Sequence, residues 1–293
     1  MNIISPYPNF IGLDRKPPKL EEALFHIIPV PCEKTVSYGE GAAKGPRAIL
    51  EASLQLELFD GISVPADHGI FTHPPVDCNG IMKQAMQNIS QAVSTVLTLK
   101  KLPVLLGGEH SITPGAVREL KNRIGEFGVV QFDAHADLRD SYQDDPFSHA
   151  CAMRRLLDLK IPIFQIGNRS MSIEEYRLRN DLKIGRLDAA TIAQDGIPGT
   201  ILPDGFPDRI YITFDVDAFD PAIIPSTGTP EPGGLSWYDV IHILDVILRG
   251  RNVVGMDIVE LAPIDGLHAP DFTIARLIYN LFGMIVRNEP YSR

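Results

Sequence analysis

The sequence predicts a three-layer α/β domain in which helices flank a central, mainly parallel sheet. Two observations lead to this fold class. Short, almost continuously hydrophobic runs alternate with longer segments that place a hydrophobic residue at every third or fourth position. Continuous hydrophobicity is typical of parallel strands, because helices cover both of their faces. The intervening helical segments supply the crossovers that parallel strands require.

The predicted elements follow in order along the chain. The hydrophobic runs predict strands at 24–30, 102–108, 127–133, 161–167, 209–215 and 252–260. The periodic segments predict helices at 80–100, 112–123, 148–158, 236–249 and 271–286. The first helix has one hydrophobic face, which we expect to be core rather than a cofactor site: Met82, Met86, Ile89, Val93, Val96 and Leu97. The 293 residues contain no repeat or flexible linker, so we expect a single domain over 1–293.

Composition excludes several classes of protein. The formal net charge is −10 and no Lys/Arg-rich run occurs, which argues against a nucleic-acid partner and suits a cationic ligand. Cys32, Cys78 and Cys151 are too widely spaced for a disulfide framework or a zinc knuckle. No apolar run approaches ~20 residues, so we expect no membrane partner. The stretch 1–10 does not have the pattern of a signal peptide, and a cytoplasmic location is expected.

Ionisable residues gather where the predicted strands end. The stretch "VVQFDAHADLRD" (129–140) begins as a core strand and then presents Asp133, His135 and Asp137 at every second position. Burying such groups is costly unless something compensates for it. The other strand ends carry Glu109 and His110, Asp215 and Asp217, and Glu260. Because ligands of open α/β sheets bind beyond the carboxyl ends of the strands, we expect these side chains to face one site.

The spacing and the ligand types predict a pair of metal ions. Residues i and i+2 of a strand are roughly 6.6 Å apart, which suits two ions about 3.5–4 Å apart better than one. Asp133 and Asp137 would be roughly 13 Å apart on a straight strand, so the chain must curl after His135. Carboxylates and imidazoles without thiolates favour Mn²⁺, with Zn²⁺, Fe²⁺, Co²⁺ or Ni²⁺ left open. The alternative is that each aspartate at a strand end only caps a turn. This alternative explains "DVD" (215–217) alone, but not "DVD" together with "GGEHS" (107–111) and "DAHAD" (133–137).

At these motifs the sequence resembles the ureohydrolase superfamily of arginases and agmatinases. The resemblance is carried by "GGEHS", "DAHADLRD" and "FDVDAFDP", and extends from residues 35–53 to 255–263. It implies a single α/β domain, two Mn²⁺ per subunit, and a homo-oligomer that is a trimer or a hexamer. By motif position, one ion would be held by His110, Asp133, Asp137 and Asp215. The other would be held by Asp133, His135, Asp215 and Asp217.

The resemblance also implies a small cationic guanidino substrate. A guanidinium carbon is a poor electrophile, and a hydroxide bridging two Mn²⁺ ions would supply the nucleophile, because metals lower the pKa of bound water. His149 matches the histidine of the family that shuttles protons, and Glu260 matches its guanidinium-binding glutamate. Asp137 is assigned to catalysis as well as to metal binding. Cys151, although close to His149 in sequence, is interpreted as a packing residue.

The substrate prediction comes from the segments beyond the ligands. "LRDSYQDDPFSHACAMRR" and "STGTPEPGGLSW" resemble agmatinases, which predicts hydrolysis of agmatine to putrescine and urea. Asp140, Asp144 and Asp145 either suit a substrate without a carboxylate or form a solvated loop, whereas Arg139 and Arg154 could serve a carboxylate. The alternatives are guanidinobutyrate, arginine or guanidine as substrate, a deacetylase with one Zn²⁺, and a non-catalytic family member. Glu109 stands where many members carry Asp, and we expect it to adjust the surroundings of the site rather than bind metal.

Overall fold

The computed structural model describes residues 7–12 and 17–288. Both ends of the predicted domain, 1–6 and 289–293, lie outside the described residues. These include most of the stretch 1–10, in which no signal peptide was expected. Within the described part of the chain, eight strands form one sheet in which every pairing is parallel, in the order β2-β1-β3-β8-β7-β4-β5-β6. The strands are β1 Phe25–Val30, β2 Ile70–Thr72, β3 Leu102–Gly107, β4 Gly128–Phe132, β5 Ile163–Ile166, β6 Gly185–Leu187, β7 Arg209–Asp215 and β8 Asn252–Val259.

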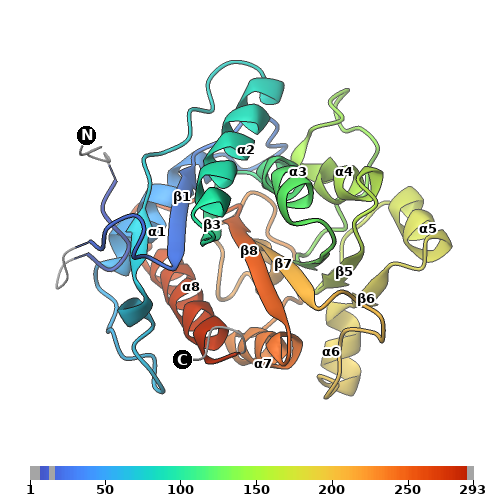
Figure 1. Cartoon of the computed structure of the whole chain (residues 1–293). Coiled ribbons are helices and arrows are strands. Elements are labelled where there is room, and N and C mark those ends of the chain that lie inside the picture. The colour runs from blue at the N-terminus through green and yellow to red at the C-terminus, as the bar shows by residue number, and fades with distance from the viewer. Residues whose placement is uncertain (1–6, 13–16, 289–293) are drawn as a thin grey trace.

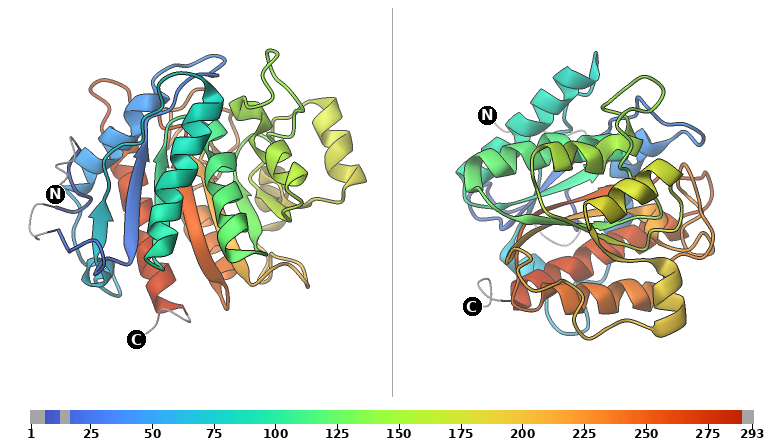
Figure 2. Two further views of the ribbon diagram at one scale, coloured as in Figure 1. Left: turned by 45° about the horizontal axis from the view of Figure 1, so that its top comes forward. Right: turned by 90° about the vertical axis from the view of Figure 1, so that its right-hand side faces the viewer.

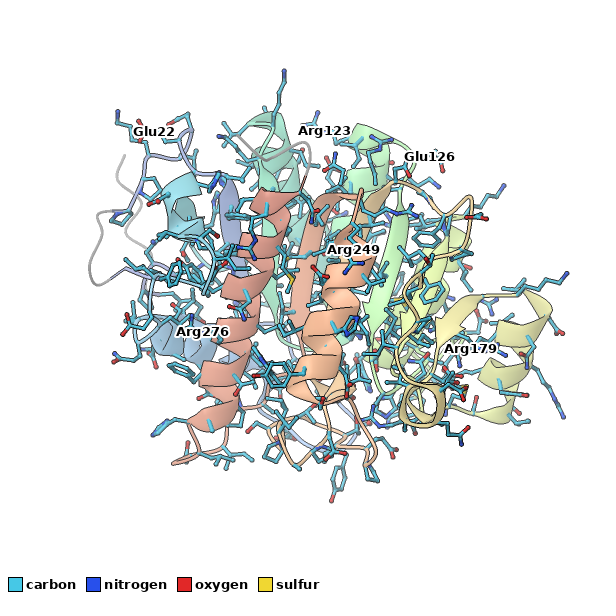
Figure 3. All side chains as sticks on the ribbon, turned by 90° about the horizontal axis from the view of Figure 1, so that it is seen from below. Glu22, Arg123, Glu126, Arg179, Arg249 and Arg276 are labelled. Atoms are coloured by element: carbon cyan, nitrogen blue, oxygen red, sulfur yellow. The ribbon has the colours of Figure 1, made fainter. Side chains whose placement is uncertain are left out.

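Helices cover both faces of this sheet. They are α1 Gly45–Ser53, α2 Met82–Thr98, α3 Thr113–Ile124, α4 Ala152–Asp158, α5 Ile173–Asp181, α6 Ala189–Asp195, α7 Trp237–Leu248 and α8 Ala269–Arg287. In Figure 1, α2, α3 and α4 lie above the sheet and α7 and α8 lie below it. The right-hand view of Figure 2 shows the resulting three layers. Seen from below, α7 and α8 lie in front of the strands (Figure 3).

A hydrophobic core fills the space on each side of the sheet. The predicted stripe of α2 is buried from Met82 to Val96, and it packs with α3 and α4 on one face. On the other face, α1, α7 and α8 pack against the sheet, and Phe282 stacks on Phe25 with ring centroids 4.0 Å apart. Burial on both faces explains why the strands are hydrophobic throughout. No helix of the described residues is long and apolar enough to cross a membrane.

The fold class and the six predicted strands are confirmed, and the sheet is parallel throughout its described length. The prediction missed β2 and β6, which are edge strands of three residues each, and the helices α1, α5 and α6. Three residues are too few to show a periodicity. The predicted helix 148–158 is correct only from Ala152, because the 3₁₀ turn η4 (His149–Cys151) precedes α4.

Candidate active site

The predicted site residues other than His149, which lies in η4, are at the ends of four neighbouring strands. In the sheet these strands stand in the order β3, β8, β7, β4, and all of them end at the same edge. His110 begins the 3₁₀ turn η3 (His110–Ile112) after β3, and Glu260 directly follows β8. Asp215 ends β7, and Asp217 lies in the 3₁₀ turn η5 (Val216–Ala218). The expectation that the strand ends meet at one site is confirmed.

Two groups of potential metal ligands adjoin each other at this edge. In the first group, Nδ1 of His110 lies 3.0 Å from Oδ2 of Asp133 and 3.1 Å from Oδ2 of Asp137. Oδ2 of Asp215 is 3.4 Å from the same nitrogen. In the second group, Nδ1 of His135 lies 2.9 Å from Oδ2 of Asp217 and 3.6 Å from Oδ1 of Asp133. Asp133 belongs to both groups, as a bridging ligand must. The roles of all six residues as metal ligands stay predictions.

The surroundings of His110 fit a bound cation. Burial alone would lower the pKa of its imidazole, but Asp133, Asp137 and Asp215, whose oxygens surround the buried Nδ1, raise this pKa well above its usual value. On the opposite edge of the ring, Nε2 lies 2.8 Å from the hydroxyl of Thr213, which donates to Asp257 at 2.6 Å. Because the hydroxyl hydrogen is used by Asp257, Thr213 accepts the Nε2 hydrogen of His110, and Nδ1 is the nitrogen left to bind a cation, either a proton or a metal ion. A nitrogen lone pair among carboxylates is a donor set for a divalent metal ion.

The chain turns sharply beyond β4. β4 ends at Phe132, the chain bends at Ala134, and His135 then pairs in an isolated parallel bridge with Ser170. The spacing of a straight strand therefore does not apply to Asp133–Asp137. Asp137 adopts a left-handed backbone conformation with φ 52°, which turns its side chain back to the cluster and confirms the predicted curl. Asn168 holds the turn, since its Nδ2 donates to the backbone carbonyls of Asp133 (2.9 Å) and His135 (2.6 Å).

Negative charge is crowded in the buried cluster. Burial raises the pKa of Asp137 to about 7, and the neighbouring charge of Asp133 adds to the increase. Burial likewise raises the pKa of Asp215, helped by Asp217. Burial alone would lower the pKa of His135, but Asp133 and Asp217 raise it to about 12. Positive charge is therefore strongly stabilised at this position, as a binuclear metal site requires.

A cavity of about 290 Å³ opens above the cluster. Glu260 and His149 line it together with the ligand groups. Oε1 of Glu260 accepts the backbone N–H of His110 at 2.6 Å, and the left-handed φ of 66° at Glu260 points the side chain back over the strand ends. Burial raises the pKa of the Glu260 carboxyl. Burial also lowers the pKa of the His149 imidazole, although the Glu109 carboxylate opposes this change.

The segment 36–39 closes one side of this cavity. The backbone N–H of Gly39 donates to the carbonyl of Gly228 at 3.1 Å. A Cβ at Gly39 would lie 2.8 Å from that same oxygen, which is closer than real Cβ contacts allow. This close approach requires glycine and ties the segment that follows β1 to the segment that follows β7.

The other residues named from the sequence fall into two sets. Arg139 lines the cavity, where its guanidinium lies 5.2 Å above the ring of Tyr142 and its Nε is 3.7 Å from Glu175. Among the described residues, the cavity lining does not include Arg154 or the loop aspartates Asp140, Asp144 and Asp145. Asp140 is 76% exposed and pairs with Arg155, so the solvated-loop alternative holds for it. Cys151 is fully buried, in agreement with a packing role.

Sequence reasoning missed residues that support the site from outside it. Arg169 is one of them: its Nη2 donates to the backbone carbonyls of Asp217 (2.8 Å), Phe219 (3.2 Å) and Glu231 (2.7 Å) and so fixes the segment after β7. Asp257 is another, and it had a sequence signal, because an acidic residue inside a hydrophobic strand requires partners. Its carboxylate accepts the hydroxyls of Thr113, Tyr211 and Thr213.

A parallel sheet whose strand ends gather carboxylates and histidines into two adjoining groups defines the class of metal-dependent α/β hydrolases. The sequence profile of the Arginase family matches residues 23–283, and the chain belongs to that family. It is similar to an N(1)-aminopropylagmatine ureohydrolase of Thermus thermophilus, with 38% identity over 90% of this chain and 91% of the relative. It is also similar to the agmatinase of Pyrococcus horikoshii, with 34% identity over 92% of this chain and 94% of the relative.

Solved structures agree with these relatives. The crystal structure of agmatine ureohydrolase of Thermoplasma volcanium superposes with a TM-score of 0.82 at 31% identity, covering 97% of this chain and 95% of that chain. The resemblance noted in the sequence motifs is thereby confirmed. The protein is a hydrolytic enzyme of the ureohydrolase kind, which sets aside the deacetylase alternative.

Proposed function

We propose that this protein is an agmatinase, which holds two Mn²⁺ ions and hydrolyses agmatine to putrescine and urea. One observation carries the proposal: the two ligand groups share the buried Asp133, and the other five predicted ligands line one cavity together with Glu260 and His149. The names of the relatives, agmatinase and N(1)-aminopropylagmatine ureohydrolase, support a substrate of the agmatine type.

Substrate binding follows from the charges of the cavity. Crowded carboxylates attract a guanidinium cation, and Oε1 of Glu260 already accepts the N–H of His110, so its second oxygen remains to accept from the guanidinium. The far end of the substrate meets the part of the cavity lined by Arg139, Tyr142 and Glu175. The carboxylate of Glu175 offsets the charge of Arg139, so this end does not present an isolated cation to the ammonium group of agmatine.

Hydrolysis needs a nucleophile and a proton for the leaving amine. A pair of divalent ions, when bound, supplies water whose pKa is low enough for attack at neutral pH. The carbon–nitrogen bond to the putrescine nitrogen then breaks, and that nitrogen must receive a proton. His149 lines the cavity, and imidazole is the side chain whose ordinary pKa lies nearest neutrality, so we assign proton transfer to this residue.

A urea-release panel tests the proposal. The manganese-loaded protein is assayed with agmatine, N(1)-aminopropylagmatine, arginine, 4-guanidinobutyrate and guanidine. We expect the highest kcat/KM with agmatine. Preference for arginine or 4-guanidinobutyrate would contradict the proposal and would indicate that Arg139 binds a carboxylate. Urea release from none of them would contradict the proposal and would indicate a substrate outside this panel.

N(1)-aminopropylagmatine is the second candidate substrate. The specific observation in its favour is the name shared by relatives that are 34–38% identical to this chain. A higher kcat/KM for this longer cation than for agmatine would establish it in place of the first candidate. The trimeric or hexameric assembly and the cytoplasmic location stay predictions, and light scattering of the purified protein tests the assembly.

A further inference from the structure

Thr35 contacts His149 at two points. Its hydroxyl oxygen accepts the backbone N–H of His149 at 3.0 Å and lies 3.2 Å from Nδ1 of the same imidazole. The rings of Tyr142 and His149 meet edge to face, with centroids 6.0 Å apart. The hydroxyl of the neighbouring Ser148 is a longer contact of Nδ1, at 3.4 Å, and Thr35 is the closer one. Since Nδ1 is engaged by these hydroxyls, Nε2 is the nitrogen that remains for the cavity that His149 lines.

A buried carboxylate holds Thr35 itself in place. Oε2 of Glu109 accepts the backbone N–H groups of Lys34 (2.8 Å) and Thr35 (2.7 Å). Its other oxygen accepts the hydroxyl of Ser111 at 2.5 Å. Glu109 is fully buried, and these bonds join it to this segment and to its own turn. The Glu that departs from the family pattern therefore contacts the segment carrying Thr35.

We propose that Thr35 is the positioning residue for His149, and that Glu109 fixes Thr35 so that Nε2 of the imidazole faces the cavity. A hydroxyl is suited to this position because its oxygen can accept from Nδ1–H and from the backbone N–H of His149 at the same time. Nδ1 keeps its hydrogen both in the neutral ring and in the imidazolium. The ring therefore keeps its orientation while Nε2 gains or loses the proton that the leaving amine needs. This inference rests on the proposed function, in which His149 transfers that proton.

Replacing the hydroxyl separates positioning from substrate binding. Thr35→Val keeps the shape of the side chain but removes the oxygen, and Thr35→Ser keeps the oxygen. We expect Thr35→Val to lower kcat for urea release by roughly ten- to a hundredfold, because positioned proton transfer contributes at least that much. KM should change less than about threefold, since the floor of the cavity is untouched. Thr35→Ser should restore kcat to within about threefold of the parent protein.

Glu109→Asp provides a second, independent variant. The shorter carboxylate cannot reach both backbone N–H groups and Ser111 from the same backbone position, so we expect a smaller loss of kcat in the same direction. Manganese content is measured for each variant to show that both ions are retained. Thr95→Val is the matched control, because Thr95 is exposed on α2, where its hydroxyl donates to the carbonyl one turn earlier.

A spectroscopic measurement does not depend on activity. Nitrogen-15 NMR of histidine-labelled, metal-free protein, with His149 assigned from a His149→Gln spectrum, reports the environment of Nδ1. We expect the Nδ1 signal to shift in Thr35→Val and to return in Thr35→Ser. An unchanged signal together with an unchanged kcat in Thr35→Val would overturn the inference while leaving the agmatinase proposal intact. A shifted signal in a protein that releases no urea would overturn the proposed function and not the contact.

Discussion

The hydroxyl of Thr213, which contacts Nε2 of His110, and the carboxylate of Asp257, which accepts that hydroxyl, lead to a prediction about metal affinity. Thr213 on β7 and Asp257 on β8 are direct partners in the register of the sheet. Oδ1 of Asp257 accepts the Thr213 hydroxyl at 2.6 Å, and Oδ2 accepts the hydroxyls of Tyr211 (2.7 Å) and Thr113 (2.8 Å). The change Asp257→Asn keeps the shape of this buried group and replaces one acceptor oxygen by a donor.

The consequence reaches the metal site through the ring of His110. In the Asp257→Asn protein, the amide oxygen is best placed at the position of Oδ2, where it can still accept the hydroxyls of Thr113 and Tyr211. The new NH₂ group then takes the position of Oδ1 and faces Thr213. The Thr213 hydroxyl then loses its acceptor and donates to Nε2 of His110, which moves the ring hydrogen to Nδ1. That nitrogen lies among three buried carboxylates and can no longer bind a cation. Changes at the groups that orient a metal ligand typically cost ten- to a hundredfold in affinity, or about 1.4–2.8 kcal/mol.

Titration of the metal-free protein with Mn²⁺ by calorimetry measures the effect. We expect Asp257→Asn to weaken binding at one of two sites by that factor, with a further cost of roughly 1–3 kcal/mol to the free energy of unfolding. Asp208→Asn, which removes a charge from an exposed side chain, is the control. A folded Asp257→Asn protein that binds both ions within about twofold of the parent would refute the reasoning.

Three further predictions concern the metal, the pH dependence and the core. Removal of metal by a chelator should abolish urea release, and Mn²⁺ should restore it when two ions are bound per chain. Asp133→Asn should lower the number of bound Mn²⁺ ions below two per chain and should lower activity by roughly a hundredfold or more. His26 and His73 are hydrogen-bonded at 2.9 Å, and burial lowers the pKa of each to about 4. Below about pH 6.5 the unfolded chain therefore binds more protons than the folded protein. The free energy of unfolding should be unaffected by these histidines above this pH and should fall by up to about 3 kcal/mol per histidine between pH 6.5 and pH 4. His73→Phe should make this pH dependence weaker in denaturant unfolding. Phe282→Ala should cost about 3–5 kcal/mol in denaturant unfolding, whereas Phe272→Ala, at a position that is 39% exposed, should cost less than about 1 kcal/mol.

The residues of the two ligand groups were predictable from the sequence, because each of them combines an ionisable residue type with a strand end. His110, Asp133 and Asp215 are ionisable groups where a hydrophobic run stops, and in a parallel sheet such positions share an edge. The curl at Asp137 also followed from the length of an extended chain. Its left-handed φ did not, because aspartate adopts this conformation only occasionally and its presence alone does not predict it.

Apart from Asp257, the residues that support the site were not predictable, because their contacts depend on residues far away in the sequence or on the backbone of loops. Thr35 reaches His149 across 114 positions, and Thr213 reaches Asp257 across 44. Threonine, which is common in strands and loops, carries no signal by itself. Arg169 bonds backbone carbonyls, whose position depends on the loop conformation rather than on any side-chain pattern. Local periodicity therefore identified what the cavity floor consists of, while the groups that orient it required the three-dimensional structure.

The order of the strands ties assembly of the site to completion of the sheet. β3 and β4 are consecutive in sequence, yet β8 and β7 separate them in the sheet. The site therefore exists only in a sheet that contains the carboxyl-terminal strands β7 and β8, which contribute Asp215, Asp217 and Glu260. Divalent ions bound at this junction would link the ends of three strands, β3, β4 and β7, from both halves of the chain. The free energy of metal binding would then add to the free energy of folding and offset the repulsion among carboxylates that burial has brought together.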